Sequence, residues 1–252
     1  MPADPHAVQP ERPTVATHAG VVATGWFEIE TGVLRNGFKG SSVVTRWDVP
    51  TVIKIGLGRR VQFNLGIPVS RTSGGPLGLN EVSAGVKWRL GERLPVLGNF
   101  AILPSVKLPS GNYRVGRGTG TTDFSLLLIS SRTVGPVALD LNAGATRLTG
   151  GTDDIPRWST VWTVSAGLPV RGRLGWTAEL FSYPATTRLS GGRPAEDQIS
   201  VLTGPTIAAA SWLVFDFGAI VPVHGPPAKA LYAGATINAG RLWRPSGPPS
   251  RK

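Results

Sequence analysis

Apolar and polar residues alternate along most of this chain with a period of two. In residues 80–90 one parity holds the charged side chains Glu81, Lys87 and Arg89, and the other parity is apolar, with Val82, Ala84, Val86, Trp88 and Leu90. Successive side chains of a β-strand point to opposite faces of the sheet. The segment therefore predicts a strand with one ionic and one apolar face, because a helix would mix these residues around its surface.

Twelve segments of strand length show this pattern. They are 22–32, 44–57, 60–70, 80–90, 96–107, 121–132, 136–147, 158–168, 172–182, 196–208, 211–221 and 229–243. The connections after even-numbered segments are short, and those after odd-numbered segments are longer, with turn-forming clusters such as 73–76. This alternation predicts an all-β fold, an antiparallel up-and-down transmembrane β-barrel of about 12 strands with both termini on the short-turn side. In the bacterial cell outer membrane that side is the periplasm.

The polar parity of these segments predicts the side chains that line the lumen. Its charged members are Glu28, Glu30, Lys54, Glu81, Lys87, Arg89, Lys107, Asp123, Asp140, Glu179 and Asp216. Charges of both signs in the middle of so many strands are very costly in a dry core. A soluble sandwich has the same period but would place these charges outside. The pattern therefore favours a barrel whose apolar face touches lipid and whose ionic face encloses water.

Aromatic residues on the apolar parity predict a girdle at the two membrane boundaries. They are Phe27, Trp88, Trp158, Trp176 and Trp243. Ordinary core packing is the alternative interpretation, and Trp26 and Trp212 have the inward parity, so the girdle is imperfect. Pro104 lies in the middle of a predicted strand, where it removes a ladder donor, and therefore predicts a bulge.

Composition adds a strong positive charge and an absence of cysteine. The 252 residues have a formal net charge of +11, with Gly 33, Pro 22 and Cys 0. The basic residues are dispersed along the chain, which argues against nucleic-acid binding. Contact with anionic head groups of membrane lipids and simple solvation of turns and tail remain as alternatives. The absence of Cys excludes a disulfide scaffold and thiolate metal sites.

The chain divides into a polar tail over 1–21, the barrel over 22–243 and a basic tail over 244–252. No run of about 20 apolar residues predicts a transmembrane helix. Residues 1–12 are rich in Pro and polar residues, so they do not resemble a secretory signal. Either the start is misassigned, or a signal lies outside this sequence, or the protein is not exported, and we favour the first two interpretations.

Several runs of the predicted barrel resemble one family. They are GVKWRL at 85–90, LPSVKLPSGN at 103–112, GTGTTDF at 118–124, DLNAGATRL at 140–148 and YAGAT at 232–236, with ETGVL at 30–34 also fitting. In this order they resemble the outer-membrane transporter-like family named for the meta-cleavage pathway of phenol degradation. The resemblance spans roughly residues 25–243 and implies an outer-membrane barrel, a passive conduit for small, often hydrophobic or aromatic molecules. The chain departs from the family by continuing past the aromatic Trp243 into a polar tail.

Enzymatic or metal chemistry has little support in the sequence. His6 and His18 lie in the N-terminal tail and His224 in a long loop, without the spacing of a zinc site. No Gly-x-Ser-x-Gly motif occurs, and the glycine-rich run at 116–122 lacks the Lys-Ser/Thr and helix of a phosphate-binding loop. We therefore expect no enzymatic step, no cofactor and no metal.

The predicted function is passive passage of small solutes through a charged lumen. A barrel of about twelve strands is narrower than a porin of 16–18 strands. We expect a narrow channel that the N-terminal tail or a long loop such as 108–120 could plug. The charged wall either sets solute preference or only neutralises itself to keep the interior wet. The alternative function is a structural or accessory envelope barrel with a closed pore that contacts other membrane components.

Overall fold

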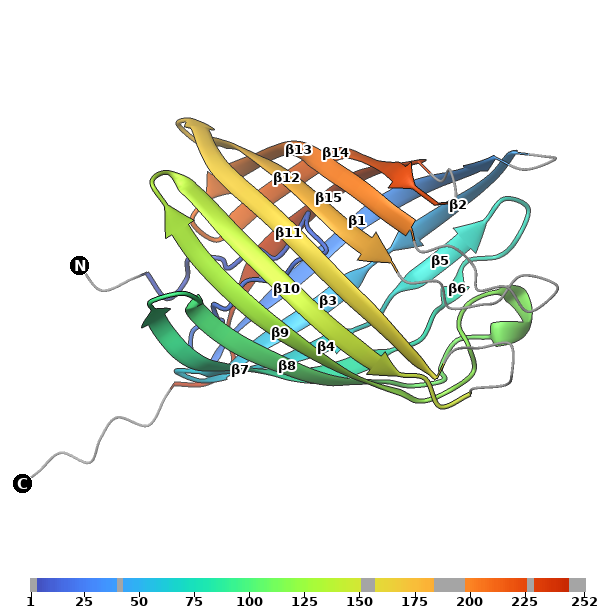
Figure 1. The fold of residues 1–252 in the computed structure, drawn as a ribbon, viewed down its shortest axis with the longest axis horizontal. Helices are drawn as coiled ribbons and strands as arrows, with labels where there is room; N and C mark the ends of the chain where they lie inside the picture. Colours follow the sequence, from blue (N-terminus) through green and yellow to red (C-terminus); the bar gives the residue numbers. More distant parts are fainter. Residues whose placement is uncertain (1–3, 40–42, 151–156, 184–197, 226–228, 245–252) are drawn as a thin grey trace, which may run out of the picture.

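The chain forms one closed antiparallel β-barrel (Figure 1). The computed structural model describes residues 4–39, 43–150, 157–183, 198–225 and 229–244. The strands are β1 (Trp26–Lys39), β2 (Val43–Val49), β3 (Thr51–Gly58), β4 (Val61–Gly66), β5 (Val69–Thr72), β6 (Gly78–Leu79), β7 (Ser83–Leu94), β8 (Gly98–Lys107), β9 (Asp123–Val134), β10 (Val137–Arg147), β11 (Trp158–Arg171), β12 (Leu174–Tyr183), β13 (Gln198–Ala210), β14 (Leu213–His224) and β15 (Lys229–Arg241). A short 3₁₀-helix, Tyr113–Val115, lies in the connection from β8 to β9.

These fifteen segments form twelve barrel strands, because β2 and β3, β4 and β5, and β6 and β7 are consecutive parts of one strand each. Pro50 separates β2 from β3, and Pro68 lies in the gap between β4 and β5. A proline has no N–H for the ladder, so the regular pairing stops at these positions without a turn. The short segment β6 pairs with β5 and leads into β7.

Pairing of the first and last strands closes the barrel. β1 pairs with β15 in an antiparallel register in which Glu30 lies opposite Thr236 and Gly32 lies opposite Gly234. On its other side β1 pairs with β3, where Glu28 lies opposite Lys54. Closure leaves no unpaired sheet edge, which is the condition for a β-sheet to span lipid.

The predicted fold class is confirmed, and most predicted strands coincide with observed ones. The first strand is displaced, because β1 begins at Trp26 rather than at residue 22 and continues to Lys39. The predicted bulge at Pro104 is wrong. Pro104 lies opposite Leu126 with no register shift, and the irregularities between β7 and β8 lie instead around Gly91. Much of the predicted long connections 148–157 and 183–195 lies outside the described residues.

Burial is inverted relative to a soluble protein. Polar and charged side chains are buried inside the barrel, among them Glu28, Glu30, Lys54, Gln62, Lys87, Asp123, Asn142, Glu179, Asp216 and Asn238. Large apolar side chains are exposed on the opposite parity, among them Leu126, Leu128, Leu141, Val164, Leu180, Phe215 and Phe217. An apolar exterior of this extent belongs in hydrocarbon. The closed barrel with this exterior places the protein in the bacterial outer membrane.

None of the helices in the described part of the chain has the length and apolar character needed to cross a membrane.

A charge on the outer face tests this placement. Leu128 lies near the middle of β9 and is 43% exposed. Leu128→Arg is expected to lower the free energy of unfolding in phospholipid bilayers by about 2–4 kcal/mol, because the charge enters hydrocarbon. The control Val96→Arg lies in the connection between β7 and β8, is 81% exposed, and is expected to change it by less than about 0.5 kcal/mol. A protein that stays folded and monomeric in buffer without detergent would contradict the placement.

Candidate functional site

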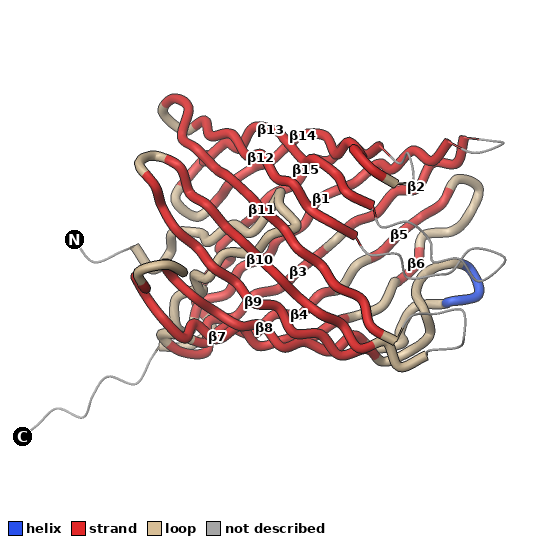
Figure 2. The backbone as a smooth tube through the Cα atoms, viewed as in Figure 1, coloured by secondary structure: helices blue, strands red, loops and turns tan. Residues whose placement is uncertain are grey.

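The N-terminal segment, residues 4–25, lies inside the barrel at its short-turn end (Figure 2). His6 enters between two tryptophans, with ring centroids 4.9 Å from Trp26 and 6.3 Å from Trp212. The segment returns to the wall at Gly25, whose N–H donates to the carbonyl of Gly56 at 2.8 Å, and then continues into β1. The two tryptophans that have inward parity therefore contact this segment.

Backbone N–H groups of the segment donate to side chains that project from successive strands of the wall. Along the chain, the donor–acceptor pairs are Gln9 with Glu28 (2.8 Å), Glu11 with Glu30 (2.7 Å), Val15 and Ala16 with Glu179 (2.7 and 2.6 Å), Thr17 with Asn142 (2.8 Å), Ala19 with Ser131 (2.7 Å) and Val22 with Gln62 (2.8 Å). These acceptors come from β1, β12, β10, β9 and β4. A segment without secondary structure needs such partners when it is enclosed, so the wall fixes its path around the lumen.

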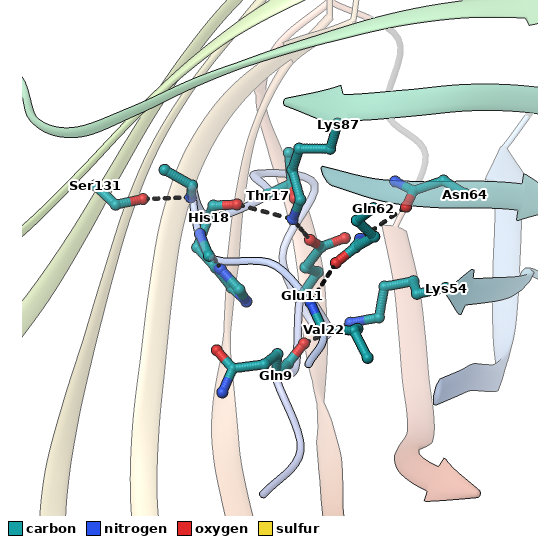
Figure 3. Close-up of polar contacts among 12 residues, drawn as sticks. Gln9, Glu11, Thr17, His18, Val22, Lys54, Gln62, Asn64, Lys87 and Ser131 are labelled. Carbon is teal, nitrogen blue, oxygen red and sulfur yellow. Dashed lines mark hydrogen bonds and ion pairs between the residues drawn. The ribbon is translucent and has the colours of Figure 1, made fainter. Parts of the chain in front are cut away.

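Lys54 is the centre of a buried ion cluster on β1 and β3. Its Nζ lies 2.9 Å from Glu28 Oε2 and 2.8 Å from Glu30 Oε1, and it also donates to the carbonyl of Gln9. The ammonium therefore binds two wall carboxylates and the N-terminal segment at once. Figure 3 shows its contact with Gln9 of the segment. A buried charge requires pairing of this kind.

Lys87 and Asp216 of the wall bind further residues of the segment. Lys87 Nζ pairs with the carboxylate of Glu11 and donates to the carbonyl of His18 at 3.0 Å (Figure 3). The guanidinium of Arg12 lies 3.2 Å from Asp216 Oδ1. The Arg12 guanidinium packs against the wall where Gly32 of β1 faces Gly234 of β15. A Cβ atom on either glycine would lie 2.5 Å from this guanidinium, so the two glycines make room for it.

Among the described residues, two small apolar clusters join the segment to the wall, and Val8, Ala16 and Val22 of the segment are buried as well. Ala19 packs with Ala101 and Ile129. Val15 packs against Phe181, Leu202 and Tyr232. The segment is thus held mainly by hydrogen bonds and ion pairs.

A second charged cluster lies toward the long connections. Lys107 Nζ pairs with Glu81 and, at 2.7 Å, with Asp123 Oδ2. Glu81 Oε1 also accepts the N–H groups of Thr119 and Gly120 at 2.7 and 2.9 Å. This cluster fastens the connection from β8 to β9 onto the wall.

The remaining predicted lumen residues lie apart from these clusters. Asp140 accepts a hydrogen bond from the hydroxyl of Ser131, which itself accepts the N–H of Ala19. Arg89 lies near the short-turn end, 3.1 Å from Glu92, and donates to the carbonyl of Arg59. Asp140 is thus linked through Ser131 to the segment, whereas Arg89 joins wall residues to each other.

Of the predicted girdle residues, Phe27, Trp158 and Trp176 lie near the ends of β1, β11 and β12, Trp243 lies just beyond β15, and Trp88 lies in the middle of β7. Trp88, Trp158, Trp176 and Trp243 are all exposed, by 40–60%. Trp158 lies at the long-connection end, where the guanidinium of Arg147 is 5.4 Å from its ring centroid.

Sequence reasoning did not identify the residues of the N-terminal segment as partners of the wall. Gln9, Glu11, Arg12 and His18 were part of a predicted polar tail. The inward parity of Trp26 and Trp212 was the available signal, because large aromatic side chains inside a lumen need something to pack against. No group of three or more His, Cys, Asp or Glu side chains is arranged to hold a metal ion within the described ranges.

Two solved structures with a similar barrel fold are an outer-membrane channel and a porin. The chain is similar to an outer-membrane channel from Pseudomonas putida F1, with a TM-score of 0.59 and 14% identity over 87% of this chain and 97% of that chain. It is also similar to the NanC porin, with a TM-score of 0.53 and 9% identity over 82% of this chain and 98% of that one. No protein-family model matches the chain, and no curated protein sequence matches it. At these identities the likeness shows the fold, and the phenol meta-cleavage family stays a prediction.

Two titratable groups of the segment have displaced pKa values. Burial raises the pKa of Glu11, but the positive charges of Lys87 and Lys54 outweigh burial and hold the pKa well below its usual 4.5. Burial, followed by the charge of Lys87, lowers the pKa of His18 to about 3. The docked segment therefore contains an ionised Glu11 and a neutral His18, whose Nδ1 accepts the N–H of Gly20.

Acidification is expected to release the segment. A group whose pKa is lower in the lumen than after release stabilises the bound segment. This stabilisation is complete at pH values above the pKa of the group in the released segment, and it is lost as the pH falls toward the pKa of the group in the lumen. For His18 the range is from about 6.5 down to about 3, and Glu11 adds to the effect below about 4.5. Single-channel conductance should therefore be higher at pH 5 than at pH 7.5. His18→Asn should reduce this difference, and an equal pH response in wild type and variant would contradict the role of His18.

Proposed function

We propose that this chain is an outer-membrane channel for small solutes and that residues 4–25 close its lumen at rest. The observation that carries the proposal is the polar interior, in which wall side chains bind the backbone of a segment that lies across the lumen. The expected solutes are hydrophobic or aromatic small molecules, in keeping with the family resemblance. The proposed activity is passive passage without an enzymatic step.

The kind of contact supports reversible closure. A hydrogen bond between the segment and the wall contributes about 0.5–1.5 kcal/mol where the acceptor is neutral and about 1.5–3 kcal/mol where it is a carboxylate, because water can take its place. The apolar groups around Ala19 and Val15 are small. Water entering the lumen could therefore replace most of what holds the segment, whereas a large apolar core would hold it permanently.

Membrane lipids are the proposed partners of the basic exterior. Exposed arginines gather at the short-turn end, namely Arg59, Arg60, Arg93, Arg132, Arg171, Arg173, Arg241 and Arg244. Arginine at this level of a membrane protein pairs with phosphate groups of anionic lipids. The same group of exposed arginines supports the second candidate function, a closed structural barrel that contacts other envelope components. The predicted basic tail beyond Arg244 lies outside the described residues.

Removal of the segment separates the two functions. A variant without residues 4–21 is expected to show a larger single-channel conductance in planar bilayers at pH 7.5 than the full chain, because the lumen fills with water and ions. The control Glu92→Gln changes an exposed carboxylate at the short-turn end and should conduct like the full chain. A folded deletion variant that passes no current would contradict the channel and favour the structural barrel.

Charge reversal in the opened barrel tests the role of the charged wall. In the variant without residues 4–21, Lys87→Glu, Arg89→Glu and Lys107→Glu together should shift the reversal potential in asymmetric KCl toward cation selectivity, because charged rings focus the field of a narrow pore. Arg35→Glu, an exposed position of β1 on the outward parity, is the matched control and should leave it unchanged. Unchanged selectivity in the triple variant would show that these charges only neutralise their neighbours.

A further inference from the structure

Two arginines flank a tryptophan on the exterior of the barrel, at the end where the long connections lie. Arg35 of β1 is opposite Trp47 of β2, and Trp47 is opposite Arg71 of β5. Because β1, β2 and β5 are neighbouring strands (Figure 1), the three residues form one row across the wall. We call Arg35, Trp47 and Arg71 the outer row.

The outer row faces away from the lumen. All of its side chains are exposed. Leu231 of β15, which lies opposite Arg35, is 59% exposed. Ser70, which precedes Arg71, is buried inside the barrel, and successive side chains of a strand point to opposite faces. The row therefore belongs to the surface that contacts lipid.

The apolar exterior of these strands ends at the outer row. The nearest residues of the same parity on its short-turn side are Val33 in β1, Val49 in β2 and Val69 in β5. The long connections of an outer-membrane barrel face the outside of the cell, and aromatic residues gather at the boundary between hydrocarbon and head groups. Arginine near such a boundary extends its charge toward the head groups. The outer row therefore lies at the head-group level of the outer leaflet.

The two arginines of the outer row lack a counter-ion. Within the described ranges neither Arg35 nor Arg71 makes an ion pair. On the inward parity of β2, by contrast, Arg46 pairs with Asp48 at 2.8 Å. At this level of the wall an inward arginine has a carboxylate, whereas the outward arginines present two uncompensated positive charges to the membrane.

The spacing of the outer row suits one phosphate group. Two strand spacings of about 4.8 Å place the Cα atoms of Arg35 and Arg71 about 10 Å apart, a gap that two arginine side chains can close over the indole between them. Arg35 Cζ lies 5.9 Å from the ring centroid of Trp47. Arg71 donates through Nε to the carbonyl of Gly75 at 3.1 Å, which leaves its Nη groups for a ligand. A guanidinium binds phosphate oxygens through paired N–H donors.

We propose that the outer row binds a phosphate group of lipid A, the phosphorylated glycolipid of the outer leaflet. Arg35 and Arg71 donate to the phosphate, Trp47 contacts the sugar, and the acyl chains cover Val33 and Val69. A soluble anion would use the charges alone, whereas an amphipathic lipid also uses the apolar surface below them. The inference does not rest on the proposed function, because the outer row faces lipid and takes no part in conduction.

Three lipids that differ in phosphate and sugar test the proposal. Lipid A, its fully dephosphorylated form and phosphatidylglycerol are titrated into the delipidated full chain in detergent, and bound lipid is measured by native mass spectrometry. Lipid A is expected to bind most tightly. Arg35→Gln together with Arg71→Gln should weaken lipid A by about tenfold or more, the loss of charge-assisted contacts to phosphate, and change the dephosphorylated form by less than about twofold.

The control Arg114→Gln together with Arg157→Gln removes the same charge from exposed positions at the same end of the barrel, outside the outer row, and should bind lipid A like the full chain. Equal lipid A affinity in the outer-row variant, an equal loss in the control, or tighter binding of phosphatidylglycerol than of lipid A would overturn the proposal. A chain that binds lipid A through the outer row but passes no current would contradict the proposed function alone.

Discussion

Enclosed backbone N–H groups that cannot donate to water must find protein acceptors, and this constraint organises the interior of the barrel. The N-terminal segment forms no helix or strand of its own within the lumen, so its N–H groups depend on wall side chains. The carboxylate of Glu179 accepts the N–H groups of two consecutive residues, Val15 and Ala16, and Asn142 both accepts from and donates to the backbone of Thr17. The inward polar residues of the wall thus provide hydrogen-bond partners for one particular path of residues 4–25 through the lumen.

The same constraint accounts for the lysines. Lys54 and Lys87 are fully buried, and both pair with carboxylates while donating to carbonyls of the segment. Burying their charges in a dry core without partners would carry a large desolvation cost. Here carboxylates and carbonyls satisfy both ammonium groups, and on the proposed release of the segment water would replace the groups that the segment supplies. An interior that is polar in both states is what a channel with a removable obstruction requires.

The fold was readable from the sequence because its cause is local. Alternation of charged and apolar residues, as in 80–90, specifies faces, and alternating connection lengths specify the topology. Inward parity also located Glu28, Lys54, Lys87 and Glu179 on the polar face. What each of them contacts was not readable, because the partners are backbone groups of a segment without periodicity, and the contact of Val15 with Glu179 spans 164 positions. The absence of a bulge at Pro104 shows a related limit, since an exposed strand position can lose one ladder bond without a change of register.

The central claim is that residues 4–25 obstruct the lumen. The chain has no cysteine, and the N–H of Ala19 donates to Ser131 Oγ at 2.7 Å, so Ala19→Cys and Ser131→Cys place two thiols on neighbouring residues of segment and wall, where a disulfide is tested without background cross-linking. The decisive measurement is the conductance of this double variant at pH 5 before and after reduction. The account predicts little current while the disulfide is intact and a rise after reduction. Equal current in both states would contradict it.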